Sequence, residues 1–371
     1  MSRVTDPYRC DGLRVAQVVA SDTFAGSERY VVNLGAGLSR LGAEVVVVGG
    51  SSRRVPMALA EAGVELPYLP AAGLVDAFRQ LRSLGRLDLV NAHLTTAEVA
   101  ATTAFPWRSR VAVVSTRHIA AHRGASVPGR LAAVWVRARL NGQIAPSEYV
   151  AHRVDGACRI VPTGVPDAPL GPHDQPVVLV AQRLEAEKDT ATALRAWATS
   201  GLASKGWELH IAGSGSQERA LRALTLELGL ERSCHFLGRV DDISERLARA
   251  GLLLATAIAE PFGLSVVEAM ATGLPVAVTG AGGHLETVGP VAGATLFQPG
   301  DHVQAADGLR RLVDDPDARR AYGEELRDRQ RSEYSLGGFV ARVVAWYGEV
   351  LAQDVDCRQR RWRSRDSRKS R

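Results

Sequence analysis

Two glutamates eight residues apart, Glu260 and Glu268, frame the stretch AEPFGLSVVEAMATGLP. Pro261 keeps the residue before it extended, and Gly263 lets the chain turn where a helix over residues 264–271 begins. The first turn of that helix presents N–H groups that favour an anion. One carboxylate lies outside the helix and one inside it, so each can accept hydrogen bonds from a different set of hydroxyls. The spacing indicates a site for a sugar attached to a nucleotide diphosphate, rather than ordinary surface residues.

Two cations, Arg183 and Lys188, leave the end of a buried strand over residues 177–181 and precede a helix. Cations at the carboxyl end of a strand, in a loop that enters a helix, suit a diphosphate. The alternative is a solvated loop in which these cations pair with Glu185 and Glu187.

Gly213 and Gly215 follow the next strand, over residues 207–213, and open a helix. The third glycine of the dinucleotide fingerprint is missing, which disfavours a dehydrogenase. Tight-turn geometry alone and a close approach of the backbone to a nucleotide are two explanations for these glycines.

Valine-rich strands alternate with helical patterns along most of the chain, which predicts parallel sheets covered on both faces. The proline-rich stretch PDAPLGPHDQP interrupts this alternation and indicates a linker. We therefore predict an α/β protein with two tandem doubly wound domains and a ligand in the cleft between them. The predicted segments are a flexible N-terminus (1–12), a first domain (13–166), a linker (167–176), a second domain (177–336), and a helix (337–352) that packs back on the first domain.

The charge of the chain is concentrated at its end. The formal net charge is +5, and the last fourteen residues, RQRRWRSRDSRKSR, hold eight basic residues and one acidic residue. We predict a disordered basic tail over residues 357–371. It is either a solvated end or a contact for an anionic membrane surface, and nucleic acid is an unlikely partner.

The composition, 46% hydrophobic and 23% charged, is typical of soluble globular proteins. No apolar run is long enough to span a membrane, and the N-terminal residues lack a secretory pattern. The four cysteines are scattered and indicate neither a zinc site nor a disulfide framework. A cytoplasmic protein, peripheral at the inner face of the membrane at most, is the expectation.

Taken together, these motifs resemble the retaining glycosyltransferases of family 4, which have the GT-B fold of two Rossmann-like domains. The resemblance covers residues 13 to 351. It implies that Arg183 and Lys188 bind the donor diphosphate and that Glu268 holds the ribose. The transferred sugar and the distal phosphate would be held by Glu260 and by the backbone of Phe262, Gly263 and Leu264. The base would contact Arg239 and Val240.

The first domain also resembles the family, through FAGSERYVVNLGAGLSRLGAEV and two strand ends that carry His93 and His118. The resemblance places Gly26 and Ser27 at a phosphate or acceptor loop, although Ser27 could simply be a helix N-cap. His118 is the better candidate for a contact near the transferred sugar, and a satisfied structural histidine is the alternative.

The chain departs from the family at three places: PTGVP replaces Pro-Asn-Gly-Val-Asp through Thr163 and Pro166, Ala25 replaces a glycine, and Thr256-Ala257 replaces Pro-Ser. None of these changes removes a charged donor ligand.

Two Asp-x-Asp sequences, at residues 315–317 and 354–356, do not follow core strands, so we predict no metal and no cofactor. Cations and a helix N-terminus would offset the charge of the leaving diphosphate. The resemblance implies transfer of a hexose from a UDP- or GDP-linked donor with retention of configuration. The acceptor could be a glycan, a lipid-linked sugar or a small molecule.

Two alternatives stay open: a nucleotide-sugar epimerase or sugar phosphorylase on the same fold, and a non-catalytic partner subunit that binds a nucleotide sugar. The helix expected over residues 129–142 carries Leu131, Val134, Trp135 and Ala138 on one face. It is either a core helix or a membrane-surface helix for lipid-linked acceptors.

Overall fold

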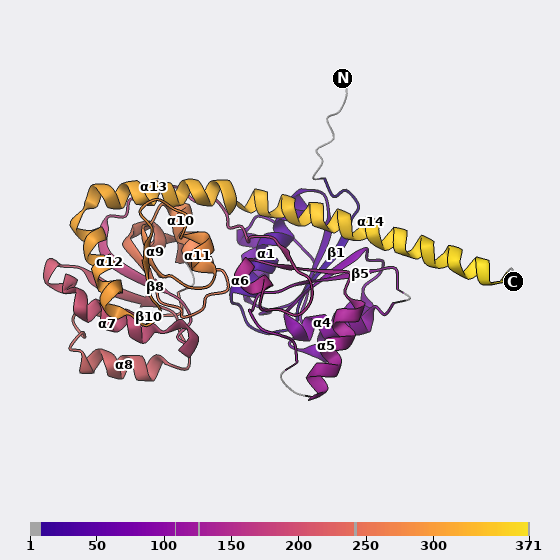
Figure 1. Cartoon of the computed structure of the whole chain (residues 1–371), viewed down its shortest axis with the longest axis horizontal. Coiled ribbons are helices and arrows are strands. Elements are labelled where there is room, and N and C mark those ends of the chain that lie inside the picture. The colour runs from indigo at the N-terminus through magenta and orange to yellow at the C-terminus, as the bar shows by residue number, and fades with distance from the viewer. Residues whose placement is uncertain (1–8, 108, 125–126, 241–242, 370–371) are drawn as a thin grey trace, which may run out of the picture. The chain divides into compact units, whose positions relative to one another are not determined.

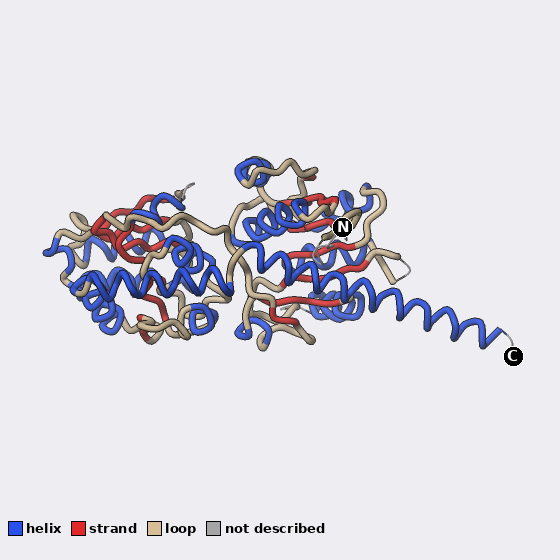
Figure 2. The backbone as a smooth tube through the Cα atoms, turned by 90° about the horizontal axis from the view of Figure 1, so that it is seen from above, coloured by secondary structure: helices blue, strands red, loops and turns tan. Residues whose placement is uncertain are grey.

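The computed structural model describes residues 9–369, except residues 108, 125–126 and 241–242 (Figure 1). The chain divides into two compact units. The first unit comprises residues 1–162 together with 336–371, and the second comprises residues 163–335. Each unit contains its own parallel sheet with helices on both faces, which confirms the predicted fold class (Figure 2).

The first unit contains a seven-stranded parallel sheet in the order β3-β2-β1-β4-β5-β6-β7. Its strands are β1 (Arg14–Val19), β2 (Glu44–Gly49), β3 (Tyr68–Leu69), β4 (Leu89–His93), β5 (Ala112–Thr116), β6 (Gly142–Ala145) and β7 (Arg159–Ile160). Its helices are α1 (Gly26–Arg40), α2 (Arg54–Glu61), α3 (Leu74–Ser83), α4 (Leu94–Ala104), α5 (Val127–Arg139), α6 (Glu148–Ala151) and α14 (Leu336–Lys369).

Alternate strand residues supply two separate cores on the two faces of this sheet. Val15 and Val114 pack with α1 and α14 on one face, whereas Val18 and Val113 pack with α3 and α4 on the other. Because side chains alternate across a strand, a strand buried on both faces must be apolar throughout, which accounts for the valine runs.

The helix α14 belongs to the first unit although it follows the second unit in sequence. Its predicted apolar face is buried there: Phe339, Val343, Trp346 and Val350 all lie in the core that contains α1. The helix continues to Lys369 and so includes most of the segment predicted to be a disordered tail, 357–371. The sequence after Gly348 contains no glycine or proline, and its many arginines favour a helix.

The second unit contains a six-stranded parallel sheet in the order β10-β9-β8-β11-β12-β13. Its strands are β8 (Gln175–Ala181), β9 (Glu208–Ala212), β10 (Cys234–Gly238), β11 (Ala250–Ala255), β12 (Val276–Thr279) and β13 (Thr295–Phe297). Its helices are α7 (Thr190–Ser200), α8 (Glu218–Glu227), α9 (Ile243–Arg249), α10 (Leu264–Thr272), α11 (Gly283–Thr287), α12 (His302–Asp314) and α13 (Pro316–Glu333), with short 3-10 turns η1 (Ala186–Lys188) and η2 (Leu202–Lys205).

The segment predicted as a linker, 167–176, is held by backbone hydrogen bonds on the second unit. The N–H of Gly171 donates to Thr272 O at 2.9 Å, and the N–H of His173 donates to Ala248 O at 3.1 Å. The unit boundaries fall instead at residues 162/163 and 335/336. Proline-rich sequence marks an irregular segment, but here its remaining N–H groups find partners on the folded unit.

The N-terminal segment predicted to be flexible, 1–12, is anchored over its last residues. Cys10 is buried, and its N–H donates to Leu41 O at 2.8 Å. Residues 1–8 lie outside the described part of the chain. Among the described residues, no helix combines the length and the apolar character that crossing a bilayer requires.

Candidate active site

The carboxyl edge of the second sheet gathers the predicted donor residues. Five neighbouring parallel strands, β10, β9, β8, β11 and β12, all end at this edge. The loops that follow them contain Arg239 and Val240, Gly213 and Gly215, Arg183 and Lys188, Glu260 to Leu264, and residues 280–284. Ligands of open α/β sheets bind at this edge.

Lys188 and Glu260 form an ion pair through Nζ and Oε2, although 72 residues separate them. Their side chains are 15% and 14% exposed, so the pair is mostly withdrawn from water yet still reachable. Two opposite charges held together in this way can engage a diphosphate and a sugar hydroxyl side by side.

The backbone of Lys188 is fixed by two side-chain hydrogen bonds, one from the end of β8 and one from the end of β11. Its carbonyl accepts hydrogen bonds from Gln182 Nε2 and from Thr256 Oγ1, both at 2.9 Å. Thr256 is fully buried. Thr256, where the family pattern has a proline, therefore has a structural role here, because its hydroxyl helps to position Lys188.

Gly263 and α10 form the turn and helix that the sequence predicts. Gly263 is the N-cap with φ +91°, and the helix runs over Leu264–Thr272, one residue longer than expected. Phe262 is buried and Leu264 is half-buried. The first-turn N–H groups of α10 point to the edge where Glu260 lies, and a helix N-terminus there favours an anion.

His284 is a site residue that the sequence reasoning missed. It is buried, its Nδ1 lies 3.1 Å from Thr279 Oγ1, and a Cβ placed on Gly263 would lie 3.0 Å from its Nε2. Burial lowers the pKa of His284 to about 4, with Glu260 opposing and Lys188 assisting that shift. The imidazole is therefore neutral at pH 7.

The glycine-rich loop GAGGH, residues 280–284, brings His284 to this position. The N–H of Gly283 donates to Glu260 O at 2.7 Å. Gly282 has φ +58°, and a Cβ there would lie 2.3 Å from Glu260 O. Three glycines in four residues, followed by a histidine, were the signal that could have revealed this part of the site.

Gly213 and Gly215 permit a close approach between two loops of the chain itself. A Cβ on Gly213 would lie 1.9 Å from Gln182 O, and one on Gly215 would lie 2.4 Å from Leu184 O. The N–H of Leu184 donates to Ser214 O at 3.0 Å. Because they lack a side chain, these glycines let the loop after β9 pack directly against the loop after β8, which carries Lys188. This close packing is a structural reason for their presence.

Arg183 and Glu268 lie at the same edge as the Lys188–Glu260 pair. Arg183 Nη2 lies 2.7 Å from Glu187 Oε1 on the exposed surface, as the solvated-loop alternative anticipates. Glu268 is the fifth residue of α10 and is half-buried. Arg239 is exposed and Val240 half-buried, directly after β10.

The first unit holds a buried chain of polar side chains below His118. His118 Nε2 lies 2.9 Å from His93 Nδ1, and His93 Nε2 lies 2.9 Å from Gln17 Oε1. Gln17 Oε1 also accepts from Asn91 Nδ2 at 3.1 Å, while Gln17 Nε2 donates to Tyr347 Oη at 3.2 Å. These contacts connect β1, β4, the loop after β5, and α14.

The same contacts fix which nitrogen of each imidazole carries a proton. Gln17 Oε1 is an acceptor, so His93 Nε2 must donate to it and His93 Nδ1 must be unprotonated. His118 Nε2 then donates to His93, which leaves His118 Nδ1 as an acceptor. A hydrogen-bond chain that starts at a buried amide thus prepares His118 to accept a hydrogen bond from a hydroxyl.

Burial keeps both histidines neutral. It lowers the pKa of His118 to about 4, with Glu28 opposing and Arg117 assisting, and it lowers the pKa of His93 well below its usual range, with the neighbouring His118 assisting. Tyr30 packs edge-on against both rings, at centroid distances of 4.8 Å to His118 and 5.4 Å to His93. The two rings are therefore held by packing as well as by hydrogen bonds.

An ion network anchors the loop that carries His118. Arg123 contacts Glu98 at 2.5 Å and Asp155 at 2.6 Å, and Arg117 contacts Asp155 at 3.2 Å. Burial alone would raise the pKa of Asp155, but hydrogen bonds and charge from Arg123 and Arg117 bring it to about 2. Two cations and two anions balance, which makes this buried network tolerable.

Gly26 and Ser27 begin α1, so Ser27 is not the N-cap. Ala25 is the N-cap, and its N–H donates to Glu28 Oε2 at 2.9 Å. Glu28 is buried and also accepts from Ser21 Oγ at 2.6 Å and from Ser27 Oγ at 2.9 Å. A carboxylate at the third helical position satisfies the entry, so no hydroxyl is needed at the cap.

The helix α5 exposes most of the face that carries Leu131, Val134, Trp135 and Ala138. The sequence analysis gave two interpretations of this face, a core helix and a membrane-surface helix. Leu131 is 72% and Val134 is 59% exposed, whereas Val136 is fully buried. Trp107 is also exposed and packs edge-on against Trp135 at 4.5 Å. We call Trp107, Leu131, Val134 and Trp135 the α5 patch. The interpretation of this face as core is wrong, because the helix turns Val136 and Arg139 inward instead.

Two family models match adjacent parts of the chain. Glycosyltransferase Family 4 matches residues 24–168, and Glycosyl transferases group 1 matches residues 166–329. The chain belongs to the group 1 glycosyltransferases. The two matches fall on the two units described above and confirm the predicted family.

Curated relatives of this glycosyltransferase match over part of their length. The 2-deoxystreptamine glucosyltransferase of Streptomyces kanamyceticus is 30% identical over 181 residues, which cover 48% of this chain and 47% of that protein. The MMP alpha-(1->4)-mannosyltransferase of Mycolicibacterium hassiacum is 33% identical over 137 residues, 36% of this chain and 33% of that protein. The matched region spans less than half of each of these relatives.

Solved structures match over nearly the whole chain. Anabaena Alr3699/HepE in complex with UDP and glucose has a TM-score of 0.78 at 18% identity, covering 91% of this chain and 99% of that one. Sucrose-phosphate synthase from Thermosynechococcus elongatus has a TM-score of 0.74 at 20% identity, covering 92% and 100%. At this identity the likeness establishes the shared GT-B fold.

Proposed function

We propose that this glycosyltransferase moves a hexose from a nucleotide-diphosphate sugar to a hydroxyl acceptor, with retention of the anomeric configuration. The observation that carries the proposal is the Lys188–Glu260 pair beside the N-terminus of α10, at the carboxyl edge of the second sheet. A cation, N–H groups and a carboxylate meet there, which are the groups that a diphosphate joined to a sugar requires.

The chemistry follows from where charge develops. Breaking the anomeric C–O bond leaves negative charge on the diphosphate and positive charge on the sugar ring. Lys188, Arg183 and the first turn of α10 stabilise the former, and Glu260 binds the sugar hydroxyls. Preorganised groups of this kind typically contribute about 3–4 kcal/mol each to the lowering of the barrier. These groups can offset the diphosphate charge, so the proposal includes no metal in the transfer step.

Glu268 is assigned the ribose hydroxyls, and the backbone at Arg239 and Val240 is assigned the base. UDP is the nucleotide we favour, because structures of Anabaena HepE with the same fold contain UDP, UDP-glucose, or UDP and glucose. GDP is the second choice. Thermal shifts with UDP-, GDP-, ADP- and dTDP-sugars would decide, since a ligand at about 100 times its dissociation constant adds about 2.7 kcal/mol of stability.

In the first unit, we assign His118 to a hydroxyl of the transferred sugar, and Gly26 and Ser27 to an acceptor or phosphate loop. The support for His118 is its prepared acceptor nitrogen, because Nε2 is already committed to His93. Retention would follow if the acceptor attacked on the face that the diphosphate leaves, with a phosphate oxygen taking its proton.

The decisive experiment separates transfer from its alternatives. Purified protein is incubated with UDP-glucose or GDP-mannose, with and without a panel of acceptors that includes lipid-linked sugars, and the products are analysed by mass spectrometry and by NMR of the anomeric proton. A new α-linked product from an α-linked donor supports the proposal. An epimerised donor, a sugar 1-phosphate, or donor binding without any product would contradict it.

For the acceptor, we propose a lipid-linked sugar at an anionic cytoplasmic membrane surface. The support is the α5 patch, whose apolar side chains are exposed beside the exposed Arg130 and Arg137. Peripheral membrane proteins usually bind in two ways at once: apolar side chains enter the membrane–water interface, and neighbouring cations are attracted to anionic lipids.

Sedimentation with anionic and with neutral vesicles tests this contact. We expect full-length protein to bind anionic vesicles, and Leu131→Glu/Val134→Glu to reduce binding several-fold. Deletion of residues 357–371 measures the separate contribution of the basic end. Equal sedimentation of the wild type and the double variant would remove the α5 patch from the proposal.

A further inference from the structure

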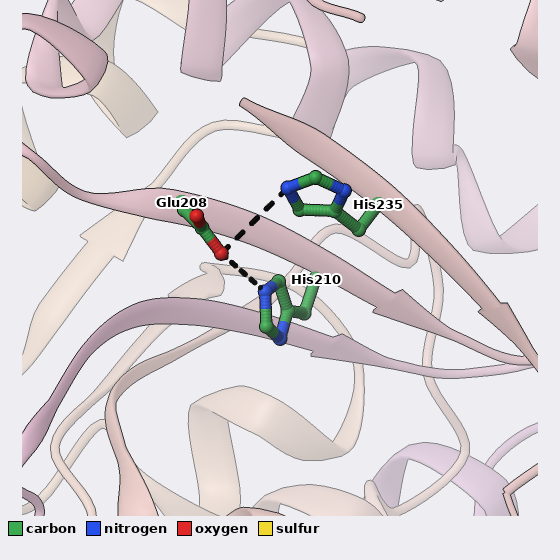
Figure 3. Close-up of side chains that lie close together, drawn as sticks. All are labelled: Glu208, His210 and His235. Atoms are coloured by element: carbon green, nitrogen blue, oxygen red, sulfur yellow. Dashed lines mark hydrogen bonds and ion pairs between the residues drawn. The ribbon is translucent and has the colours of Figure 1, made fainter. Parts of the chain in front are cut away.

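Three side chains with metal-binding atoms converge on the edge of the second sheet (Figure 3). Glu208 and His210 are two residues apart on β9, so their side chains lie on the same face of the strand. His235 is on the edge strand β10 and is the direct partner of His210 in the parallel ladder. The pairing register itself thus places the third group beside the first two.

The ligand atoms lie close to tetrahedral spacing. Glu208 Oε2 is 2.9 Å from His210 Nε2 and 3.6 Å from His235 Nε2, and all three lie within 4.8 Å of one another. Zinc bonds of about 2.0–2.1 Å in tetrahedral geometry require ligand atoms roughly 3.3 Å apart. The planes of the two imidazole rings cross at 82°, and rotation of the rings would change the distances between these ligand atoms.

The surroundings allow an ion to enter and to complete its coordination. The side chains are 48%, 18% and 41% exposed for Glu208, His210 and His235 respectively. Water can therefore occupy the fourth position. Within the described part of the chain, these residues form the one group of three such side chains at this spacing. The scattered cysteines gave no indication of this site, because its ligands are an E-x-H pair and a histidine 25 residues further on.

We propose that Glu208, His210 and His235 form a binding site for a divalent transition metal, with Zn²⁺ the preferred ion. Two imidazoles and one carboxylate favour Zn²⁺, Co²⁺, Ni²⁺ or Cu²⁺ over Mg²⁺ and Ca²⁺, which prefer oxygen ligands. The ion takes the place of the proton in the hydrogen bond between His210 Nε2 and Glu208 Oε2.

The site is separate from the transfer chemistry. Glu208 is the first residue of β9, whereas Gly213 follows its last residue, so the length of the strand, roughly 15 Å, separates the two ends. The ion therefore fastens the edge strand β10 to β9 and adds stability without taking part in the reaction. This inference does not depend on the proposed function.

The test is metal titration of the full-length chain after removal of bound metal with a chelator. We expect one Zn²⁺ per chain by calorimetry, a visible Co²⁺ spectrum of a four-coordinate site, and a rise in melting temperature of about 5 °C at saturating Zn²⁺. Mg²⁺ and Ca²⁺ should produce neither signal.

Variants locate the site and separate it from folding effects. His210→Ala and His235→Ala should weaken binding at least tenfold, while His302→Ala, a histidine of α12 in the same unit, should bind like the wild type. Glu208→Gln keeps the shape and should also weaken binding. Circular dichroism without metal checks the fold of each variant. Binding that is absent in the wild type, or unchanged in His210→Ala, His235→Ala and Glu208→Gln, overturns the proposal, whatever the outcome of the transfer assay.

Discussion

The candidate site residues at the carboxyl edge of the second sheet include an ion pair, whereas those at the carboxyl edge of the first sheet include two neutral imidazoles. Lys188 and Glu260 meet as an ion pair, while burial keeps His93 and His118 neutral. A glycosyl donor carries two negative phosphates, and a hydroxyl acceptor carries none. In a glycosyltransferase that works as proposed, the charged pair therefore meets the donor phosphates, and the neutral imidazole of His118 meets a sugar hydroxyl.

The two edges are also built differently. In the second unit, short loops and glycines hold Lys188, Glu260 and His284 together. In the first unit, His118 depends on a hydrogen-bond chain that passes through Gln17 to Tyr347 on α14. The Lys188–Glu260 pair is thus positioned by loops, glycines and the hydrogen bonds of Gln182 and Thr256 to the Lys188 carbonyl, whereas His118 is positioned by a longer chain of side chains.

The largest expected effect is loss of the charged pair. Lys188→Ala and Glu260→Ala should each reduce turnover at least tenfold, and up to roughly 100-fold, because each removes a group placed at developing charge. Steady-state kinetics with a donor identified by thermal shift measures this. Lys205→Ala removes an exposed pair with Asp314 in the same unit and should stay within about twofold. Wild-type turnover in Lys188→Ala and Glu260→Ala would show that the ion pair at the second sheet does not contribute to transfer.

The next effect concerns the neutral edge. Gln17→Leu removes the acceptor for His93 Nε2, so the protons on His93 and His118 can rearrange, and turnover should fall about tenfold, a typical contribution for one hydrogen bond to a reacting group. The ¹⁵N resonances of His118 should move from the Nε2–H to the Nδ1–H pattern. Val114→Ala, which opens a cavity in the same core, controls for lost packing. An unchanged His118 spectrum in Gln17→Leu would contradict the hydrogen-bond chain.

A smaller effect links pH to stability and appears in both units. His118 and His284 have pKa values of about 4 in the folded chain, against about 6.5 when unfolded. The unfolded chain thus binds more protons between these values. The free energy of unfolding is highest above pH 6.5 and should fall by about 1–3 kcal/mol per histidine as pH drops towards 4. Urea unfolding of the wild type, His118→Gln and His284→Gln between pH 7 and pH 4.5 measures this, and equal pH profiles would refute it.

The smallest effect concerns Glu187, which forms an exposed ion pair with Arg183. Glu187→Ala should change stability by less than about 0.5 kcal/mol, because exposed pairs contribute little, and it should leave turnover within about twofold. Arg183→Ala should nevertheless reduce turnover at least tenfold if this guanidinium binds the diphosphate. Kinetics and melting temperatures of the two variants measure both effects. Equal turnover of the two variants would support the alternative in which Arg183 is a solvated loop residue that pairs with Glu187 and does not bind the diphosphate.

Much of the charged edge was predictable because its residues lie in short local patterns. The α10 entry depends on Pro261 and Gly263, which restrict or free the backbone within a few residues. His284 was missed because it follows a different strand, and only the folded sheet brings its loop against Glu260.

The neutral edge was less predictable for the same reason. Gln17 and Tyr347 are 330 residues apart, and nothing in the pattern around either residue points to the other. The capping role of Glu28 was hidden by Ser27, a better N-cap by residue type. The length of α14 was not predicted, because the high charge after residue 356 indicates disorder by composition, although that segment contains no helix-breaking residue.

The return of α14 to the first unit has a consequence for how the protein is made. The core around Tyr30, Leu34 and Leu38 includes Phe339 and Tyr347, so a ribosome completes the second unit before it delivers the last part of the first. During synthesis the first unit has an uncovered apolar face until α14 is made, while the second unit, which is continuous in sequence, can already fold. A chain that stops at residue 335 would be unable to finish the domain with which it began.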